Sequence, residues 1–468
     1  MSLAEVILQD DVKQVDEWLR SQPVDVNEVD EFGYPPLVES AIVNNQEIAK
    51  LLIHQGADVN TQDMTGRSAL HWAVDNSNYE LAKLLLKHGA DPNSYTIGSQ
   101  PVLVQPLLRQ QKSLSELLQH YGGDVEFAHD YINTKLLGHR FELRGMVDIV
   151  DHRNHFIEIS YEGFILEFSL QVIVDSLSRF LNHFQARHLR HYFPQLTMIK
   201  DRLNSGAELI RYQHFSINRE QKQERINQLL SQNPLIIPIG YEGHAISFVK
   251  LNQLWARCDR GEFGREHGCI NLYKAHTQLT PDYFYHLLYN KHSRSYITQT
   301  VDQELRLQYV TEIPISPQQT GNCSWANMEA SIPTLLFLLL NHANFQNNQN
   351  VQPQTMEKSL DIYYQWQEWD RDRALEDCIQ SFHRTKSQAR KASKAAVLGA
   401  ILVQQCHYQS FKNVKRAEKI LSVLTLPNYR YVLEHYIQAY CHPKMSAAGK
   451  NLLELFEDCG IDPGEFSI

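Results

Sequence analysis

The sequence predicts a multidomain protein of the α and α+β class, with a helical repeat array first, a mixed α+β region next and a helical region last. Three observations predict this layout: a motif that recurs every 33 residues, short β-branched and aromatic segments broken by glycine, and helical apolar spacing from about Met356 to Phe456. At 468 residues the chain is too long for one ordinary core, so several domains are expected.

The N-terminal repeat has a period of 33 residues. The motif GADVN at Gly56–Asn60 recurs as GADPN at Gly89–Asn93 and weakly as GGDVE at Gly122–Glu126. The best copy is DMTGRSALHWAVDNSNYELAKLLLKHGADPN, which has the turn, the two helices and the terminal glycine of an ankyrin repeat. With an atypical first copy that ends near Asp25–Asn27, we expect four ankyrin repeats over residues 1–128.

These repeats predict a solenoid that binds other proteins. Each helix pair can bury its leucines only against the next pair, so the repeats form one continuous core with a concave binding surface. We therefore expect protein partners to bind through the repeats. His71, in the segment SALHWA, is expected to satisfy backbone groups rather than to bind a ligand or to catalyse.

The middle of the chain lacks the 33-residue repeat and contains strand-like segments. The strand-like segments are FELRGMVDIVD, HFIEISYEGFILEFSL and PLIIPIGYEGHAISFVKLNQLWARCDRG. Between the second and the third, over Val172–Gln232, the apolar residues have helical spacing. We predict a central α+β domain over residues 129–355, with a helical insertion near 172–232, and a C-terminal helical region over 356–468.

Two of the expected strands, Ala245–Val249 and Leu254–Asp259, would form a hairpin. A tight turn at Leu251–Asn252 would place residue 250 opposite 253 and His244 opposite Asp259. Opposed residues share a face of the sheet, so the Asp259 carboxylate could orient and charge-stabilise the His244 imidazole.

The segment SPQQTGNCSWANMEASI places Cys323 at the start of an expected helix. Unpaired backbone N–H groups and the helix dipole stabilise a thiolate at that position. A glutamine upstream could direct its amide at the oxygen that gains charge when an acyl group is attacked. Gln318 and Gln319 are both candidates, and Gln318 is preferred.

The order His244, Asp259, Gln318, Cys323 resembles the cysteine-protease clan that contains the ubiquitin-like-protein proteases and the YopJ-type acyltransferases. The resemblance covers about residues 234–340 and implies a cysteine-protease-like domain. It also implies that Cys323 is the nucleophile, that His244 is its acid–base partner, and that Asp259 and Gln318 assist them. Two departures are the absence of a glycine after Cys323 and the presence of Pro333, which should kink or end the helix.

Each candidate also has a purely structural interpretation. Cys323 could be a small apolar residue of a buried helix, and His244 could be a core histidine. Asp259 could simply pair with the neighbouring arginines 257 and 260. The rival nucleophiles are Cys258 and Cys269, and the only cluster with zinc-binding residue types has no standard spacing: Cys258, His267, Cys269 and His276. No metal and no cofactor are therefore expected.

Composition limits the classes of partner. A net charge of -10 and a pI near 6.1 argue against general nucleic-acid binding, because phosphate contacts need clustered Lys and Arg. The longest apolar run, Leu335–Leu340, is far shorter than the roughly 18 residues of a membrane-spanning helix. Seven cysteines without CxxC spacing fit reduced thiols rather than a disulfide framework. The sequence leaves the oligomeric state open.

The whole chain, including the segments INTKLLGHRFELRG and GNCSWANMEA, resembles the translocated ankyrin-repeat effectors of Legionella, of the ankyrin H type. The resemblance implies synthesis in the bacterial cytoplasm and delivery by type IV secretion into the host cytosol or nucleus. Two hypotheses follow: a thiol hydrolase or acyltransferase that acts on a host protein, or a non-catalytic scaffold whose protease-like domain is an interaction surface.

Overall fold

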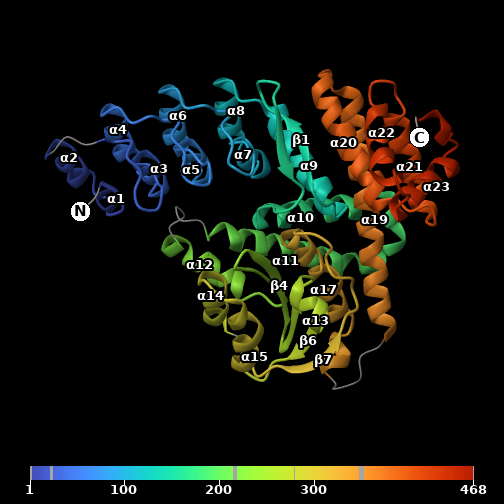
Figure 1. Cartoon of the computed structure of the whole chain (residues 1–468). Helices are drawn as coiled ribbons and strands as arrows, with labels where there is room; N and C mark the ends of the chain where they lie inside the picture. The colour runs from blue at the N-terminus through green and yellow to red at the C-terminus, as the bar shows by residue number, and fades with distance from the viewer. Residues whose placement is uncertain (1–2, 22–24, 214–218, 279, 347–352, 467–468) are drawn as a thin grey trace.

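The structure, a computed structural model, describes residues 3–21, 25–213, 219–278, 280–346 and 353–466. The helices of the N-terminal third form a row that leads to α9 and to the C-terminal helices (Figure 1). A five-stranded sheet and its helices lie beneath that row, and the described ends of the chain lie at opposite sides of the molecule.

Successive helix pairs build the N-terminal row, as the 33-residue period predicts. Their bounds are α1 Leu3–Ile7, α2 Val12–Ser21, α3 Pro36–Ile42, α4 Gln46–His54, α5 Ala69–Asp75, α6 Tyr79–Lys87, α7 Val104–Leu108 and α8 Lys112–His120. The repeated leucines, among them Leu52, Leu85 and Leu118, are all buried in one continuous core. His71 accepts the backbone N–H of Ser68 at its own helix start, which is the structural role expected of it.

The asparagine of each GADxN motif connects one repeat to the next. Asn60 accepts the backbone N–H of Asp91 at 2.8 Å and donates to the carbonyl of Gly89. Asn27 makes the equivalent pair of bonds one repeat earlier, and Asn93 makes it one repeat later. One side-chain amide thus satisfies two backbone groups in the next copy of the motif, 29 and 31 residues further along the chain.

A long helix and a small hairpin join the repeats to the rest of the chain. They are α9 Val125–Arg140, β1 Met146–Val150 and β2 Phe156–Ser160. Helix α9 packs against α7 of the repeats, against β1 and against the C-terminal helix α19. It therefore contacts all three parts of the molecule.

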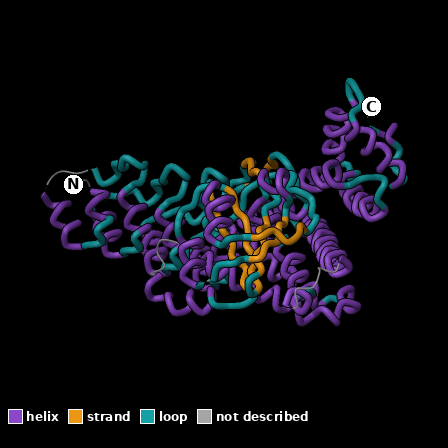
Figure 2. Tube along the Cα trace, turned by 90° about the horizontal axis from the view of Figure 1, so that it is seen from below, coloured by secondary structure: helices purple, strands orange, loops and turns teal. Residues whose placement is uncertain are grey.

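The sheet is fully antiparallel with the strand order β3-β4-β5-β6-β7. Its strands are β3 Leu235–Tyr241, β4 His244–Leu251, β5 Leu254–Cys258, β6 Ile270–Lys274 and β7 Gln308–Glu312. Figure 2 shows these strands gathered at the centre with helices around them. One face carries Ser247 and Cys258, which contact Ser331 and Thr334 of the helix 331–340. The other face carries Trp255, which stacks on Phe284.

Helices cover both faces of the sheet. They are α10 Leu166–Asn182, the 3-10 helix Phe184–Tyr192, α11 Phe193–Arg211, α12 Arg219–Leu230, α13 Glu262–His267, α14 Pro281–Tyr289, the π-helix Tyr296–Thr300, α15 Val301–Glu304, α16 Cys323–Glu329, α17 Ser331–Leu340 and α18 His342–Gln346. Helices α16 and α17 meet at Ala330, three residues before Pro333, so the expected break is present. By length and composition Cys323–Leu340 could cross a membrane, but 83% of it is buried within the protein, as a core helix is.

The predicted hairpin register is wrong by two residues. Leu251 pairs with Leu254 and Ser247 with Cys258, so the turn is at Asn252–Gln253 rather than at Leu251–Asn252. Asn252 adopts a positive φ of 56°, which asparagine tolerates, while Leu251 is buried in the core. Because a shift of two residues preserves the face, His244 and Asp259 become diagonal neighbours on the same side of the sheet.

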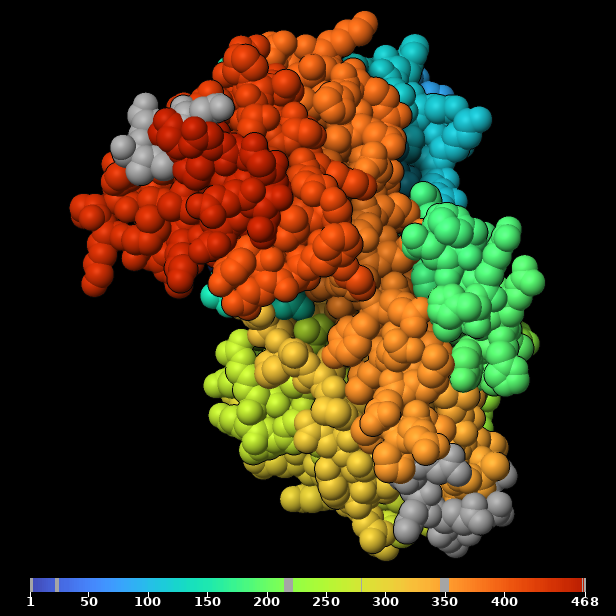
Figure 3. Space-filling model, turned by 90° about the vertical axis from the view of Figure 1, so that its right-hand side faces the viewer, coloured from blue at the N-terminus to red at the C-terminus, as the bar shows by residue number. Residues whose placement is uncertain are grey.

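The C-terminal helices form a separate lobe. They are α19 Pro353–Arg384, α20 Gln388–Gln405, α21 Phe411–Leu424, α22 Arg430–Cys441, α23 Ala447–Asp458 and the 3-10 helix Pro463–Glu465. Figure 3 shows this lobe in orange to red above the sheet domain, with the surface of α19 running from one to the other.

Candidate active site

Three segments of the chain meet at one end of the sheet. His244 is the first residue of β4, Asp259 directly follows β5, and Cys323 is the first residue of α16. His244 Nε2 is 2.9 Å from Asp259 Oδ1, and the Cys323 thiol lies beside the same imidazole, close enough for each group to shift the pKa of the other. Because Nε2 is bonded to Asp259, Nδ1 is the ring nitrogen that remains for the thiol.

Asp259 is held by more than the histidine. Its Oδ1 accepts the backbone N–H of Gly261 at 2.9 Å, and its Oδ2 accepts the Tyr241 hydroxyl at 3.3 Å. A Cβ at Gly261 would lie 2.6 Å from His244 Cε1, so only glycine allows the ring this position. Sequence reasoning missed Tyr241, although the two-residue turn Glu242–Gly243 places it opposite His244.

The ionisation of the pair favours a thiolate beside an imidazolium. Burial alone would lower the pKa of His244, but the hydrogen bonds to Asp259 and Cys323 outweigh burial and raise that pKa to about 9. Burial would raise the pKa of Cys323, but the His244 hydrogen bond, the N–H of Ala245 and the imidazolium charge lower it below its usual value. The Ala245 nitrogen lies 3.4 Å from the sulfur.

Cys323 differs from every other cysteine of the chain. Burial raises the pKa of the rival thiols Cys258 and Cys269 to about 11, and the other four thiols, Cys378, Cys406, Cys441 and Cys459, are also shifted upward. Cys323 is partly exposed, and the His244 side chain is 23% exposed, so the pair is open to solvent. A lowered thiol pKa together with access is the condition for a nucleophilic cysteine.

Asn327, one helical turn after Cys323, connects the three segments. Its Nδ2 donates to the carbonyl of Ala245 and its Oδ1 accepts the backbone N–H of Arg260, both at 2.6 Å. Its own carbonyl accepts the hydroxyl of Ser247 at 2.8 Å. The completely buried amide therefore sets the position of the thiol helix relative to the His244 strand and the Asp259 loop. Its spacing of four from Cys323 is the sequence feature that could have identified it.

The arginines beside Asp259 are paired elsewhere. Arg257 bonds Asp302, while Arg260 bonds Glu142 and Glu329, each at 2.9 Å. The purely structural interpretation of Asp259, as a partner of these arginines, is therefore wrong. The interpretation of His244 as a core histidine also fails, because its ring is partly exposed and bonded to Asp259.

The two candidate glutamines are placed differently. Gln318 is buried, and its backbone N–H donates to the carbonyl of Arg260 at 2.8 Å, whereas Gln319 is exposed. The side-chain Oε1 of Gln318 has no hydrogen-bond partner among the described residues. The structure brings Gln318 beside the Asp259 loop but gives it no direct bond to His244, Asp259 or Cys323, so its role remains a prediction.

The residues weighed as zinc ligands do not form a metal site. Among the residues that the structure describes, no group of three or more His, Cys, Asp or Glu side chains could hold a metal ion. Cys258 instead contacts Thr334 at 3.3 Å, and His276 contacts Gln308.

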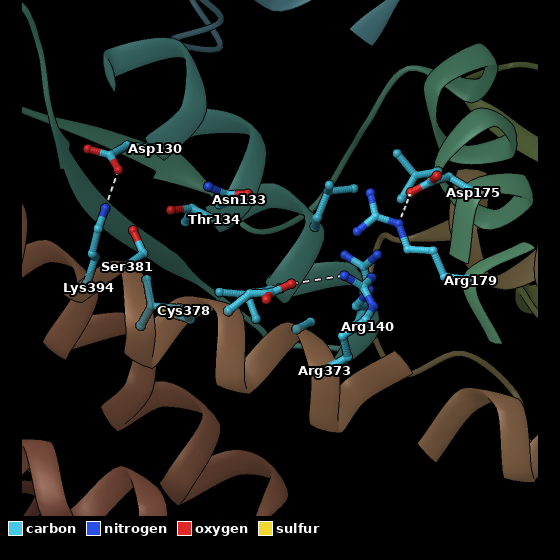
Figure 4. Close-up of a pocket in the computed structure, with 16 residues that line it drawn as sticks. Asp130, Asn133, Thr134, Arg140, Asp175, Arg179, Arg373, Cys378, Ser381 and Lys394 are labelled. Atoms are coloured by element: carbon cyan, nitrogen blue, oxygen red, sulfur yellow. Dashed lines mark hydrogen bonds and ion pairs between the residues drawn. The ribbon is translucent and has the colours of Figure 1, made fainter. Parts of the chain in front are cut away.

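A separate cavity of about 290 Å³ lies between α9, α10, α19 and α20. Its acidic and basic side chains largely neutralise one another: Lys394 pairs with Asp130 and Arg179 with Asp175 (Figure 4). No residue of the Cys323 site lines it.

Comparisons with known proteins agree with the repeats and extend over the whole chain. Residues 3–96 match the family of ankyrin repeats in three copies, which confirms the repeats over that range. A search of the curated proteins gave no match. The solved structure of the Legionella effector AnkH is 44% identical to this chain, with a TM-score of 0.86, and the similarity covers 99% of this chain and 98% of that one. With such identity over nearly the full length, the chain belongs to the family of the Legionella effector AnkH.

Proposed function

We propose that this protein is a translocated effector that binds a host protein through its ankyrin repeats and acts on it by thiol chemistry at Cys323. The observation that carries the proposal is the meeting of Cys323, His244 and Asp259, from three separate segments, at one partly exposed point. Similarity to a Legionella effector and the ankyrin repeats support a role inside a host cell.

The proposed reaction is acyl transfer. The Cys323 thiolate attacks a substrate carbonyl carbon, so a C–S bond forms and the carbonyl π electrons move to the oxygen. The bond to the leaving group then breaks as those electrons return, and the His244 imidazolium gives its proton to the leaving group. His244 next takes a proton from water, or from an acceptor amine or hydroxyl, which attacks the thioester and frees the thiol.

The surrounding residues would assist this reaction in different ways. Asp259 would hold the imidazole by its bond to Nε2 and stabilise the positive charge. Gln318 and the backbone N–H of Cys323 would donate to the developing oxyanion.

A second candidate function is a non-catalytic scaffold, in which the protease-like domain is an interaction surface for a host complex. The observation that favours it is Ser324 in place of the glycine that commonly follows the nucleophile in this clan. Ser324 is buried and its hydroxyl lies 3.4 Å from that of Ser169 in α10.

Thiol labelling separates the two functions. Iodoacetamide labelling at pH 7, mapped by mass spectrometry, compares wild type with Cys323→Ala and His244→Ala. The control variant is His276→Ala, because the His276 ring contacts Gln308 of β7 and lies outside the candidate site. We expect Cys323 to be labelled first in wild type and in His276→Ala, and at least about tenfold more slowly in His244→Ala. Equal labelling in all three thiol-containing proteins, with host-partner binding retained in Cys323→Ala, would support the scaffold.

A further inference from the structure

The first ankyrin repeat contains an acidic pocket that the thiol chemistry does not use. It has a volume of about 370 Å³ and lies where α1 and α2 meet the segment 25–35 and the start of α3. Five carboxylates line it: Asp25, Glu28, Asp30, Glu31 and Glu39. Trp18 and Tyr34 add aromatic surface, and none of its lining residues is a lysine or an arginine.

Glu39 is the least expected member of this set. Its side chain lies in α3 with only 3% of the residue exposed, and its Oε2 has no hydrogen-bond partner among the described residues. A second acid, Asp30, lines the same pocket and acts on it electrostatically. Burial first, and then the charge of Asp30, raise the pKa of Glu39 to about 8. A buried carboxyl group is costly when no donor or cation satisfies it, so this one is suited to a ligand.

The spacing of the five carboxylates favours an organic cation over a bare metal ion. A bare divalent ion needs several oxygens at about 2.0–2.6 Å. Among the described residues, no three carboxylates are close enough together for that. An organic cation can instead contact separated carboxylates through several N–H groups and lay its aliphatic stem against aromatic rings. The pocket offers both kinds of surface in one place.

We infer that this pocket binds a lysine or arginine side chain of a protein partner. The inference rests on the proposed partner-binding role of the repeats and is independent of the chemistry at Cys323. The cation would enter between Glu39 and Asp30, a proton held on Glu39 would leave to solvent, and Trp18 would cover the aliphatic stem. The rim acids Glu28 and Glu31, both exposed, would attract the basic segment that carries the side chain.

Peptide titration into the full-length chain tests the inference. The probes are Ac-Gly-Arg-Gly-NH2, its lysine analogue and its citrulline analogue, which has nearly the shape of arginine without the charge; binding is followed by NMR at the Trp18 indole. We expect the cationic peptides to bind at least about tenfold more tightly than the citrulline peptide. Equal binding of all three, or no binding of either cation, would overturn the inference.

Two variants and a control locate the binding. Glu39→Gln should weaken binding of the arginine peptide about tenfold, and the exposed Glu28→Gln, which leaves the core intact, about threefold. The control Glu80→Gln removes one exposed acid from α6 and should leave binding unchanged. An equal loss in the control would mean that only net charge matters, and saturation by Mg²⁺ or Ca²⁺ in competition would mean a metal site instead.

The same titration separates this inference from the proposed function. Cys323→Ala should bind the arginine peptide as wild type does. Loss of thiol reactivity with retained peptide binding would therefore refute only the chemistry, and retained thiol reactivity without peptide binding would refute only the pocket.

Discussion

At the scale of single residues, the candidate site depends on a few buried polar contacts. Nearly every hydrogen bond of Asp259 and Asn327 is made to a group that positions His244 or Cys323. Inside a protein such bonds are strong, and an unpaired partner is costly. Small polar changes should therefore alter the ionisation and position of the thiol without rebuilding the fold.

Asp259→Asn should narrow the pH range of activity. The Asp259 hydrogen bond and charge help to raise the pKa of His244 to about 9 against the lowering effect of burial, so their loss lowers that pKa. In the proposed reaction the imidazolium donates a proton, so activity is expected below the His244 pKa and should be lost above it. The upper limb of the kcat/KM–pH profile should therefore shift to lower pH. The pH at which alkylation of Cys323 becomes fast should rise, because less imidazolium remains to stabilise the thiolate.

The control for that profile is Asp302→Asn. It removes the α15 carboxylate that pairs with Arg257 of β5, and both limbs of the profile should stay in place. Unchanged limbs in Asp259→Asn would contradict the proposed role of this carboxylate.

Asn327→Ala should destabilise the protein by roughly 3 kcal/mol, since it leaves the carbonyl of Ala245 and the N–H of Arg260 buried and unpaired. It should also slow alkylation of Cys323, because the thiol helix is no longer tied to the His244 strand. Urea unfolding measures the first effect and iodoacetamide kinetics the second. Asn227→Ala, at an exposed position of α12, should change stability by less than about 0.5 kcal/mol.

At the scale of elements, helix α9 is constrained by close packing at Gly138. Its Gly138 faces the ring of Tyr161, which follows β2, and a Cβ there would lie 2.8 Å from Tyr161 Cδ1. Tyr161 is 2% exposed and has little room to move. A glycine inside a helix, normally a weakness, is here required by the close packing of the hairpin on α9.

Gly138→Ala should therefore lower the free energy of unfolding by roughly 1–3 kcal/mol, despite the better helix propensity of alanine. The matched change is Gly206→Ala in α11, where the nearest atom would lie at an ordinary 3.4 Å from the new Cβ. That variant should be neutral or up to about 1 kcal/mol more stable. Denaturant unfolding of both proteins gives the comparison, and equal effects would refute the packing argument.

At the scale of the whole molecule, helix α9 packs on the repeats, and its C-terminal end contacts α16 and the C-terminal lobe. Arg140 forms a buried ion pair with Asp370 of α19, and its guanidinium lies 5.1 Å from the Trp325 ring centroid in α16. Glu142, just beyond α9, bonds Arg260 beside Asp259. These buried contacts thus join the end of α9 to the sheet domain and to the C-terminal lobe.

Arg140→Ala should cost roughly 3 kcal/mol, because it leaves the Asp370 carboxylate buried with one cation fewer. Thermal unfolding should show this loss of stability in a transition that includes the C-terminal lobe. Hydrogen exchange of the α19 amides would assign the transition to that lobe. Arg20→Ala removes an exposed pair with Asp16 and should change stability by less than about 0.5 kcal/mol. A similar effect in both variants would mean that the buried pair contributes little.

The sequence by itself determined what repeats or is local: the 33-residue period of the repeats, the helix that begins at Cys323, and the residue types of the candidate thiol site, whose chemistry stays a prediction. Local propensity and apolar spacing suffice for these features. Only the tertiary structure decided the hairpin register, the contact of Tyr241 with Asp259, the bridging by Asn327 and the pairing of Arg257 and Arg260 with distant acids. Such contacts join residues far apart in the chain, and their partners are chosen by burial and hydrogen-bond satisfaction in the packed molecule, which no local pattern encodes.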